Sequence, residues 1–206
     1  MTGTNAAVET AIEALRRGRL AVIPTDTVYG LAADAESEAA ARALYAAKGR
    51  DAIQPTAVLF ASLDVLHERL PELPPAASRA ANALLPGPLT LVLPNPGRRY
   101  AWLNAERPDA VGVRVPDVAG PGETVLRALG SLVATSANLP GGPDPRRVED
   151  VPAAIREAVA AVVDGGELPG TPSTVVDLTG AEPRVLREGA VAAAEILERL
   201  QALTDF

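Results

Sequence analysis

The chain has 206 residues, of which 48% are hydrophobic and 22% charged, so it is long enough and apolar enough to fold as one compact domain. It contains no cysteine, which excludes disulfides, thiolate catalysis and cysteine-bound zinc. Its net charge of −7 argues against tight general binding of nucleic acid, because phosphate backbones attract basic surfaces.

Amphipathic helices and short apolar strands alternate along the first half of the chain. Apolar residues recur at helical spacing from Val8 to Leu15, and Gly18 marks the end of this first helix. Ser62 is placed to cap a later helix. The other elements expected in this half are a strand at 20–23, a hydroxyl-rich turn at 24–27, a helix at 38–47, a strand at 57–61, and helices at 64–70 and 76–85.

The second half continues the same alternation. The expected elements are strands at 90–93, 111–115 and 132–134, a short helix at 123–129, a Pro/Gly loop at 139–147, a helix at 149–158, strands at 159–163, 174–178 and 184–186, and a closing helix at 191–203. This order predicts a mixed α/β fold with helices packed against a twisted sheet. The chain lacks a signal-peptide pattern and an apolar stretch of about 20 residues, so we expect a cytoplasmic protein without membrane spans.

The common catalytic and nucleotide-binding motifs are absent from the sequence. It has neither G-x-x-x-x-G-K-[ST] nor G-x-G-x-x-G. The only histidine, His67, lies on a predicted helix and is expected at the surface, which argues against a Ser-His-Asp triad. What remains is a set of Lys, Arg, Ser, Thr and Asn residues in loops, which is suited to hold phosphates and carboxylates without a proton relay.

Lys48 is the only lysine among 19 basic residues, and Arg50 follows it two residues later. The other basic residues are all arginine, which either reflects GC-rich codon usage alone or leaves lysine where arginine could not serve. The two side chains either face one anionic ligand or stabilise the C-terminal end of the preceding helix, an effect of about 0.3–1 kcal/mol. Ser136 and Asn138 follow a strand, where they either satisfy backbone groups of a turn or bind a ligand.

Four more positions have both a local and a ligand-binding explanation. Arg114 interrupts an apolar strand, so its burial requires an anionic partner, either a ligand or an internal Asp or Glu. Thr25 and Thr27 are typical of a stabilised turn, but they could also face a ligand. Arg187 is either a solvated residue paired with Glu188 or directed at a ligand.

Seven segments carry these polar positions: PTDTVYGLAADA from Pro24, KGR from Lys48, GPLTLVLP from Gly87, VGVRVP from Val111, ATSAN from Ala134, PSTVVDL from Pro172 and VLREGAV from Val185. Together they resemble the YrdC-like family, which includes the threonylcarbamoyl-AMP synthases. The segments follow the family's order over roughly residues 8–200, so we expect the whole chain, 1–206, to form a single YrdC-like domain.

The resemblance implies a fold and a reaction. The fold is an open, twisted, mixed α/β sheet flanked by helices, with a concave basic cavity. The implied enzyme is an adenylyltransferase that condenses L-threonine, bicarbonate and ATP to threonylcarbamoyl-AMP and pyrophosphate. ATP is then a substrate, Mg²⁺ is expected to assist, and no residue is assigned as a metal ligand. The product would pass to a tRNA threonylcarbamoyl transferase complex that modifies tRNA at position 37, without tight tRNA binding by this chain.

The family's signature residues match positions of this sequence one by one. The implied catalytic residues are Lys48, Arg50, Ser136 and Asn138. The implied ATP contacts are these four residues and Arg187, and the implied threonine contacts are Thr27, Arg114 and Ser173.

Some positions depart from the family pattern. Gln54 and Thr56 stand where relatives often have other residues after the Lys-x-Arg segment, and Asp144 replaces a frequent serine, which brings negative charge toward a triphosphate unless it faces Mg²⁺ or solvent. Two alternative functions stay open: an RNA-binding module of the same fold without catalysis, and a carbamoyl-adenylate enzyme with another substrate. The acidic charge and the 3% of aromatic residues count against RNA binding, which relies on basic grooves and aromatic stacking.

Overall fold

The structure is a computed structural model that describes residues 2–49 and 56–203. Its strands are β1 (Ala21–Pro24), β2 (Tyr29–Asp34), β3 (Ala57–Phe60), β4 (Leu89–Pro94), β5 (Ala110–Arg114), β6 (Ser131–Ser136), β7 (Ala161–Val162), β8 (Thr174–Asp177) and β9 (Arg184–Arg187). Its helices are α1 (Thr2–Arg16), α2 (Glu38–Lys48), α3 (Leu63–Arg69), α4 (Pro75–Leu84), α5 (Pro121–Leu129), α6 (Ala153–Ala158) and α7 (Ala193–Gln201), with short 3-10 helices η1 (Ala101–Leu103) and η2 (Val148–Asp150).

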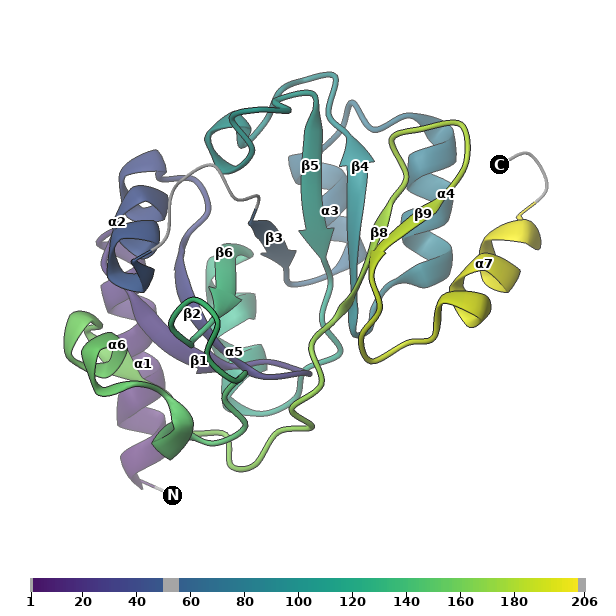
Figure 1. Cartoon of the computed structure of the whole chain (residues 1–206). Helices are drawn as coiled ribbons and strands as arrows, with labels where there is room; N and C mark the ends of the chain where they lie inside the picture. Colours follow the sequence, from purple (N-terminus) through teal and green to yellow (C-terminus); the bar gives the residue numbers. More distant parts are fainter. Residues whose placement is uncertain (1, 50–55, 204–206) are drawn as a thin grey trace.

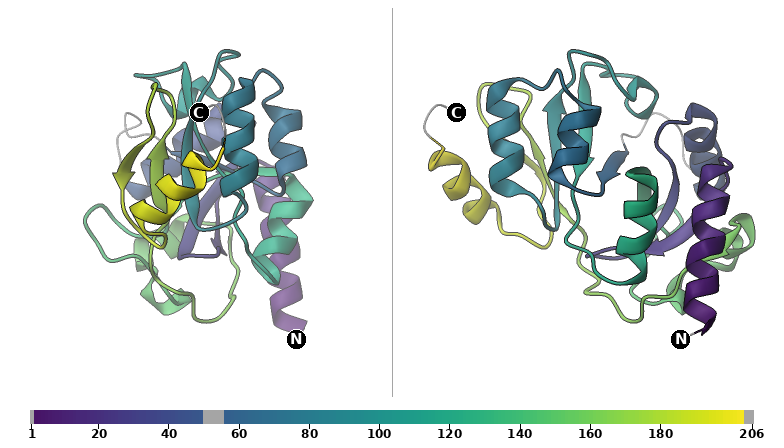
Figure 2. Two further views of the ribbon diagram at one scale, coloured as in Figure 1. Left: turned by 90° about the vertical axis from the view of Figure 1, so that its right-hand side faces the viewer. Right: turned by 180° about the vertical axis from the view of Figure 1, so that it is seen from behind.

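Across the described ranges, nine strands form one mixed sheet in the order β7-β1-β2-β6-β3-β5-β4-β8-β9 (Figure 1). The pairs β1–β7, β3–β5 and β4–β8 are parallel, and the other neighbouring strands are antiparallel. Seen from behind, α1, α3, α4 and α5 lie in front of the sheet, so these helices cover one of its faces (Figure 2). The expected open, twisted, mixed sheet flanked by helices is confirmed.

Side chains on β4 and β5 alternate between the helix-covered face and the opposite face. Leu89, Leu91 and Leu93 are buried on the side of the core, whereas Thr90 and Val92 line a cavity on the other side. Because successive residues of a strand point to opposite faces, each strand contributes to both the core and the cavity. The face of β4 opposite its core-facing leucines therefore forms part of a cavity wall.

Local signals define the ends of several helices as expected. Ser62 caps α3, and its Oγ accepts a hydrogen bond from the Val65 N–H at 3.2 Å. Ser37 caps α2 in the same way, and Gly49 ends that helix with a φ of 63°, a backbone conformation that glycine adopts without strain. Within the described ranges, no helix is both long and apolar enough to cross a bilayer.

Three elements differ from the sequence-based expectation. Strand β2 was not predicted, because its sequence YGLAAD contains glycine and alanine, which favour strands weakly, yet it is buried between β1 and β6. The helix expected at 149–158 is divided into η2 and α6 by Pro152, which restricts the preceding residue and lacks an N–H group. The strand expected at 159–163 is reduced to β7, a two-residue strand at the edge of the sheet.

Candidate functional site

A cavity of about 290 Å³ lies on the face of β4 and β5 that is turned away from the core. The described residues that line it include five of the predicted site residues: Thr27, Arg114, Ser136, Ser173 and Arg187. They come from the turn between β1 and β2, the ends of β5, β6 and β9, and the residue before β8. Strand register brings them together, because Ser136 pairs with Gly30 beside the β1–β2 turn and Arg187 pairs with Val175.

Lys48 extends from the end of α2 to the edge of this cavity. Its Nζ donates to the Ser136 carbonyl at 2.7 Å and to the side chains of Asn138 and Thr135, each at 3.0 Å. The residue is only 6% exposed. A buried ammonium group stays charged where oxygen atoms replace its water shell. Because these bonds reach β6 and the segment after it, the role of Lys48 is not limited to the end of its own helix.

Asn138 connects this cluster to the loop at 139–147. The Ser136 hydroxyl donates to Asn138 Oδ1 at 2.7 Å, and Asn138 Nδ2 donates to the Gly142 carbonyl at 2.7 Å. Nδ2 also lies 3.4 Å from a carboxylate oxygen of Asp144, which lines the cavity. Lys48 and Asn138 do not line the cavity themselves, so they form a layer directly behind Ser136.

Arg114 is held by an internal carboxylate, which answers the question that the sequence left open. Its Nη2 donates to Asp26 Oδ1 at 2.6 Å and to the Thr27 hydroxyl at 3.3 Å. Burial lowers the pKa of Arg114, and the neighbouring Asp26 acts in the opposite direction. Thr25 has the turn-stabilising role expected for it, because its hydroxyl donates to the Val28 carbonyl at 2.8 Å.

Ser173 lies between a strand hydroxyl and an arginine. The Thr90 and Ser173 hydroxyls are 2.8 Å apart, and Arg187 Nη2 donates to the Ser173 carbonyl at 2.7 Å and lies 3.3 Å from its hydroxyl. Glu188, the surface partner considered for Arg187 from the sequence, accepts a hydrogen bond from the Ala193 N–H at 3.1 Å. The contacts of Arg187 therefore place it on the cavity wall.

Sequence reasoning missed four polar residues of the cavity: Thr90, Asn104, Arg107 and Thr135. Thr90 and Thr135 stand inside the quoted segments GPLTLVLP and ATSAN, but each reads as an ordinary strand residue. Arg107 donates to Asp177 at 3.2 Å and to Thr179 at 2.7 Å. Burial raises the pKa of Asp177, but hydrogen bonds from Thr179 and Arg107 outweigh this effect and hold that pKa below its usual range.

The cavity carries cationic groups whose charge is partly compensated. Of its three described arginines, Arg114 and Arg107 are paired with Asp26 and Asp177, respectively. Across residues 2–49 and 56–203, no group of three His, Asp or Glu side chains is arranged to hold a metal ion.

The other positions singled out in the sequence have three different outcomes. Arg50 and Gln54 fall outside the described residues, so their places relative to the cavity are not part of this structure. Thr56 lines the cavity. His67 lies on α3 at the surface, 2.9 Å from Asn82 Oδ1, away from the cavity.

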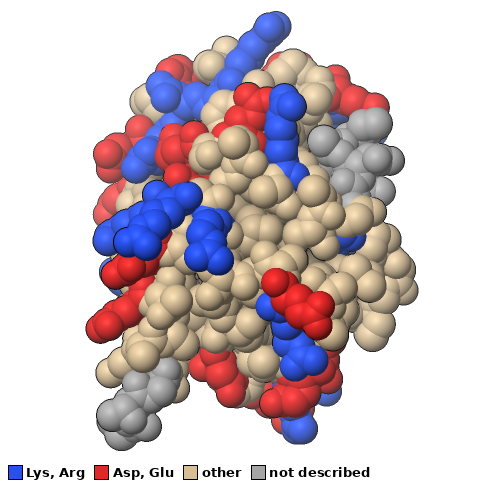
Figure 3. Space-filling view, turned by 90° about the vertical axis from the view of Figure 1, so that its left-hand side faces the viewer, with Lys and Arg blue, Asp and Glu red and all other residues tan. Residues whose placement is uncertain are grey.

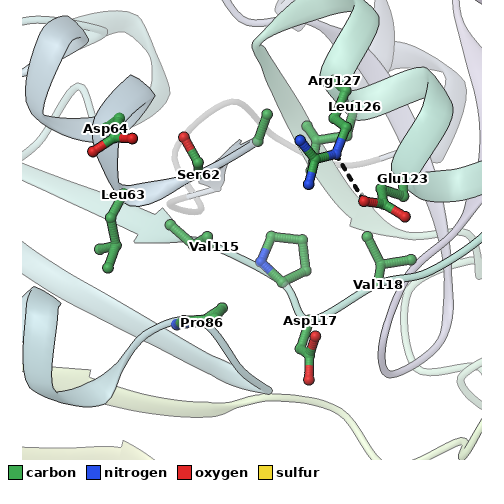
Figure 4. Close-up of a pocket in the computed structure, with 12 residues that line it drawn as sticks. Ser62, Leu63, Asp64, Pro86, Val115, Asp117, Val118, Glu123, Leu126 and Arg127 are labelled. Carbon is green, nitrogen blue, oxygen red and sulfur yellow. Dashed lines mark hydrogen bonds and ion pairs between the residues drawn. The ribbon is translucent and has the colours of Figure 1, made fainter.

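A second cleft of about 440 Å³ lies between α3, α5 and the segment that follows β5 (Figure 4). It is the larger of the two, but it contains none of the predicted site residues. Its charged side chains are Asp64, Asp117, Glu123 and Arg127, and the last two form an ion pair at 2.7 Å. Arg127 is thus paired with an acid of the same cleft, whereas the smaller cavity brings together three arginines and several predicted hydroxyl residues. The smaller cavity is therefore the candidate site.

The fold and the cavity define a class of protein: an open-sheet α/β protein with a cavity between strand ends that guanidinium and hydroxyl groups line. The family model described as "Telomere recombination" and named for Sua5, YciO and YrdC matches residues 13–189. The chain belongs to this Sua5/YciO/YrdC family.

Relatives with similar sequences include a Mycobacterium tuberculosis protein, 36% identical over 194 residues, which are 94% of this chain and 88% of that protein. The threonylcarbamoyl-AMP synthase of Pyrococcus abyssi is 36% identical over 183 residues, 88% of this chain and 54% of that protein.

Among solved structures, P. abyssi Sua5 in complex with L-threonine matches with a TM-score of 0.82 and 34% identity, covering 93% of this chain and 56% of that one. E. coli YciO matches with a TM-score of 0.79 and 27% identity, covering 92% and 91%. The present chain thus spans little more than half of the archaeal relative and most of the YciO chain.

Proposed function

We propose that this protein is a threonylcarbamoyl-AMP synthase, which condenses L-threonine, bicarbonate or CO₂, and ATP to threonylcarbamoyl-AMP and pyrophosphate. The observation that carries the proposal is the convergence of Lys48 and Asn138 behind Ser136, in the wall of a cavity that Thr27, Arg114, Ser173 and Arg187 also line. Its relatives in P. abyssi and humans bear this name. The cytoplasm, where tRNA is modified, is the compartment that we propose for it.

The reaction needs few proton transfers from the protein. The threonine amine takes up CO₂ to form a carbamate, and a carbamate oxygen then attacks the α-phosphorus of ATP. A new P–O bond forms to the carbamate while the bond to the pyrophosphate oxygen breaks, and pyrophosphate leaves. The protein mainly has to hold two labile reactants in line, which lowers the entropic cost of the attack.

We assign the side chains of the cavity to the two substrates, which would lie next to each other because Arg187 contacts Ser173. Arg114, with Thr27 and Ser173, would bind the threonine carboxylate and hydroxyl, because guanidinium and hydroxyl groups donate strong hydrogen bonds to carboxylates. Ser136 and Arg187 would bind the phosphates from the cavity wall, and Lys48 and Asn138 would act on them from directly behind Ser136, with Arg50 as the further contact that the family resemblance implies. The fixed charge of Lys48 stabilises the negative charge that develops during displacement.

The metal requirement follows from the nucleotide. Mg²⁺ in nucleotide enzymes is held mainly by phosphates and water, with one or two carboxylates from the protein. Asp144 is the only carboxylate among the described cavity-lining residues, so it would contact a nucleotide-borne Mg²⁺. When bound, Mg²⁺ would neutralise phosphate charge.

The direct test is pyrophosphate release from ATP with threonine and bicarbonate present together or omitted singly. We expect release only with both, and a product with the mass of threonylcarbamoyl-AMP. Replacing threonine by other amino acids tests the substrate: preference for another amino acid would indicate a different carbamoyl-adenylate enzyme. Absence of release with every amino acid, together with RNA binding, would contradict the proposal in favour of an RNA-binding module.

The product is labile, so a partner must consume it. A tRNA threonylcarbamoyl transferase complex is the class of partner that we propose, since it would move the threonylcarbamoyl group from AMP to adenosine 37 of tRNA. Supplying purified protein and a transferase with tRNA should yield threonylcarbamoyladenosine in the tRNA, measured by nucleoside mass spectrometry.

A further inference from the structure

Asp26 lies behind Arg114 and is not among the cavity-lining residues. One of its carboxylate oxygens accepts from Arg114 Nη2 at 2.6 Å, and the other accepts from the Asp117 N–H at 3.2 Å. The side chains of Asp26 and Arg114 are 6% and 11% exposed. Asp26 therefore joins the β1–β2 turn to the end of β5 and to the segment that follows it.

This contact determines which nitrogen of Arg114 faces the cavity. Nη2 is occupied by Asp26 and Thr27. Nε is buried and has no hydrogen-bond partner within the described ranges. Nη1 makes no hydrogen bond with a described residue and is not among the buried, unpaired atoms, so it is the guanidinium nitrogen available to a ligand.

We propose that Asp26 is a positioning residue for threonine recognition, which acts by holding the Arg114 guanidinium so that Nη1 meets the substrate carboxylate. This inference rests on the proposed function. Asp26 does two things for a buried arginine: it compensates the charge when no substrate is bound, and it keeps the guanidinium plane in one orientation. Without it, Arg114 would have to find new acceptors and would no longer be pre-organised for the carboxylate.

The structure offers a matched pair of variants for the test. Asp26→Asn keeps the size of the side chain but removes its charge and one acceptor. Asp117→Asn is the control, because Asp117 contacts Asp26 through its backbone N–H, while its side chain lies in the second cleft (Figure 4).

Threonine and ATP affinities are measured separately, by calorimetry and by the KM values of pyrophosphate release. We expect Asp26→Asn to weaken threonine binding roughly 10- to 100-fold, the size expected when a hydrogen bond between charged groups is lost. The affinity of Asp26→Asn for ATP should stay close to that of the wild type. The control Asp117→Asn should keep the thermal midpoint of the wild type. Asp26→Ser should show the same selective loss for threonine, so the test does not depend on one variant folding.

A double-mutant cycle separates positioning from a general structural role. If Asp26 acts through Arg114, adding Asp26→Asn to Arg114→Ala weakens threonine binding no further, whereas independent roles give additive losses. Additive losses, or an Asp26→Asn protein that binds threonine like the wild type, would overturn the inference. A wild-type protein that does not bind threonine would instead refute the proposed function itself.

Discussion

At the scale of single residues, Lys48 shows why the only lysine of the chain is not an arginine. Its ammonium group lies among oxygen atoms from Thr135, Ser136 and Asn138, at 2.7 to 3.3 Å. A compact group with three donors fits such a cluster, whereas a planar guanidinium needs more space and a different arrangement of acceptors. Because Lys48 is only 6% exposed, its surroundings leave little room for a guanidinium group.

We therefore expect both Lys48→Arg and Lys48→Met to reduce threonine-dependent pyrophosphate release by at least about 100-fold, because each removes a charged donor from its fixed position. Arg42→Met is the matched control, since Arg42 lies on the same helix with its side chain 74% exposed and paired with Glu38. Circular dichroism shows whether each variant is folded. A Lys48→Arg protein with most of the activity would mean that charge alone is sufficient there.

At the scale of secondary-structure elements, the first turn of α5 supports the β1–β2 turn that carries Asp26 and Thr27. A Cβ added to Gly122 would lie 2.2 Å from the Pro24 carbonyl oxygen and 3.1 Å from a methyl group of Val118. Only a residue without a side chain allows the helix to approach the backbone this closely. The packing of α5 thus helps to define the position of the turn.

Gly122→Ala should lower the free energy of unfolding by about 1–3 kcal/mol, as expected for overpacking against backbone. It should also weaken threonine binding, because the turn must move. The control Glu123→Ala removes an exposed i,i+4 ion pair and should cost at most about 0.5 kcal/mol. Urea denaturation measures both variants, and equal stability of Gly122→Ala and the wild type would contradict the role of this contact.

Strand β2 begins with Tyr29, whose hydroxyl connects the sheet to the segment 164–166. The hydroxyl lies 2.7 Å from the Gly166 carbonyl and 3.1 Å from Asp164 Oδ1, and it accepts from the Gly165 N–H at 3.0 Å. Burial raises the pKa of Tyr29 to about 12; the Gly165 N–H opposes this rise and Asp164 adds to it. The folded protein thus holds the phenolic proton more tightly than the unfolded chain does.

This raised pKa predicts a loss of stability in alkali. The stabilisation is fully present below pH 10, the ordinary value of tyrosine, and is lost as the pH rises toward 12. We expect Tyr29→Phe to be less stable than the wild type by roughly 1 kcal/mol at neutral pH, because it loses hydrogen bonds. The difference between the two proteins should shrink between pH 10 and 12, as measured by urea unfolding. A difference that does not change with pH would contradict the burial of this phenol.

At the scale of the whole molecule, the surface does not suit a polyanion. One face shows charges of both signs near its edges and uncharged residues across its centre (Figure 3). The net charge is −7, and several arginines are paired with acids on the surface. Binding to a phosphate backbone requires clustered basic residues that release counterions.

We expect no retention of tRNA by the isolated protein at concentrations up to about 10 µM in physiological salt, measured by filter binding. The proposed reaction does not need such retention, because tRNA meets the product on the transferase. Binding that weakens steeply as salt is raised would contradict this expectation and would favour an RNA-binding role.

The general architecture could be predicted from the order of apolar segments, since the strands at 111–115 and 174–178 and the helices at 38–47 and 76–85 follow from local periodicity. Strand β2 could not, because its burial between two neighbours overrides a weak local preference. Likewise, Thr90 belongs to the cavity only because β4 pairs with β8 and places it beside Ser173.

The sequence by itself determined the family, the set of cationic and hydroxyl side chains, and the lack of cysteine, because these depend on which residues occur and in what order. Only the tertiary structure decided that Asp26, and not a ligand alone, balances Arg114, and that Lys48 lies buried behind Ser136. Such contacts join residues 87 to 90 positions apart. Local patterns do not encode them, since they depend on strand pairing and side-chain burial.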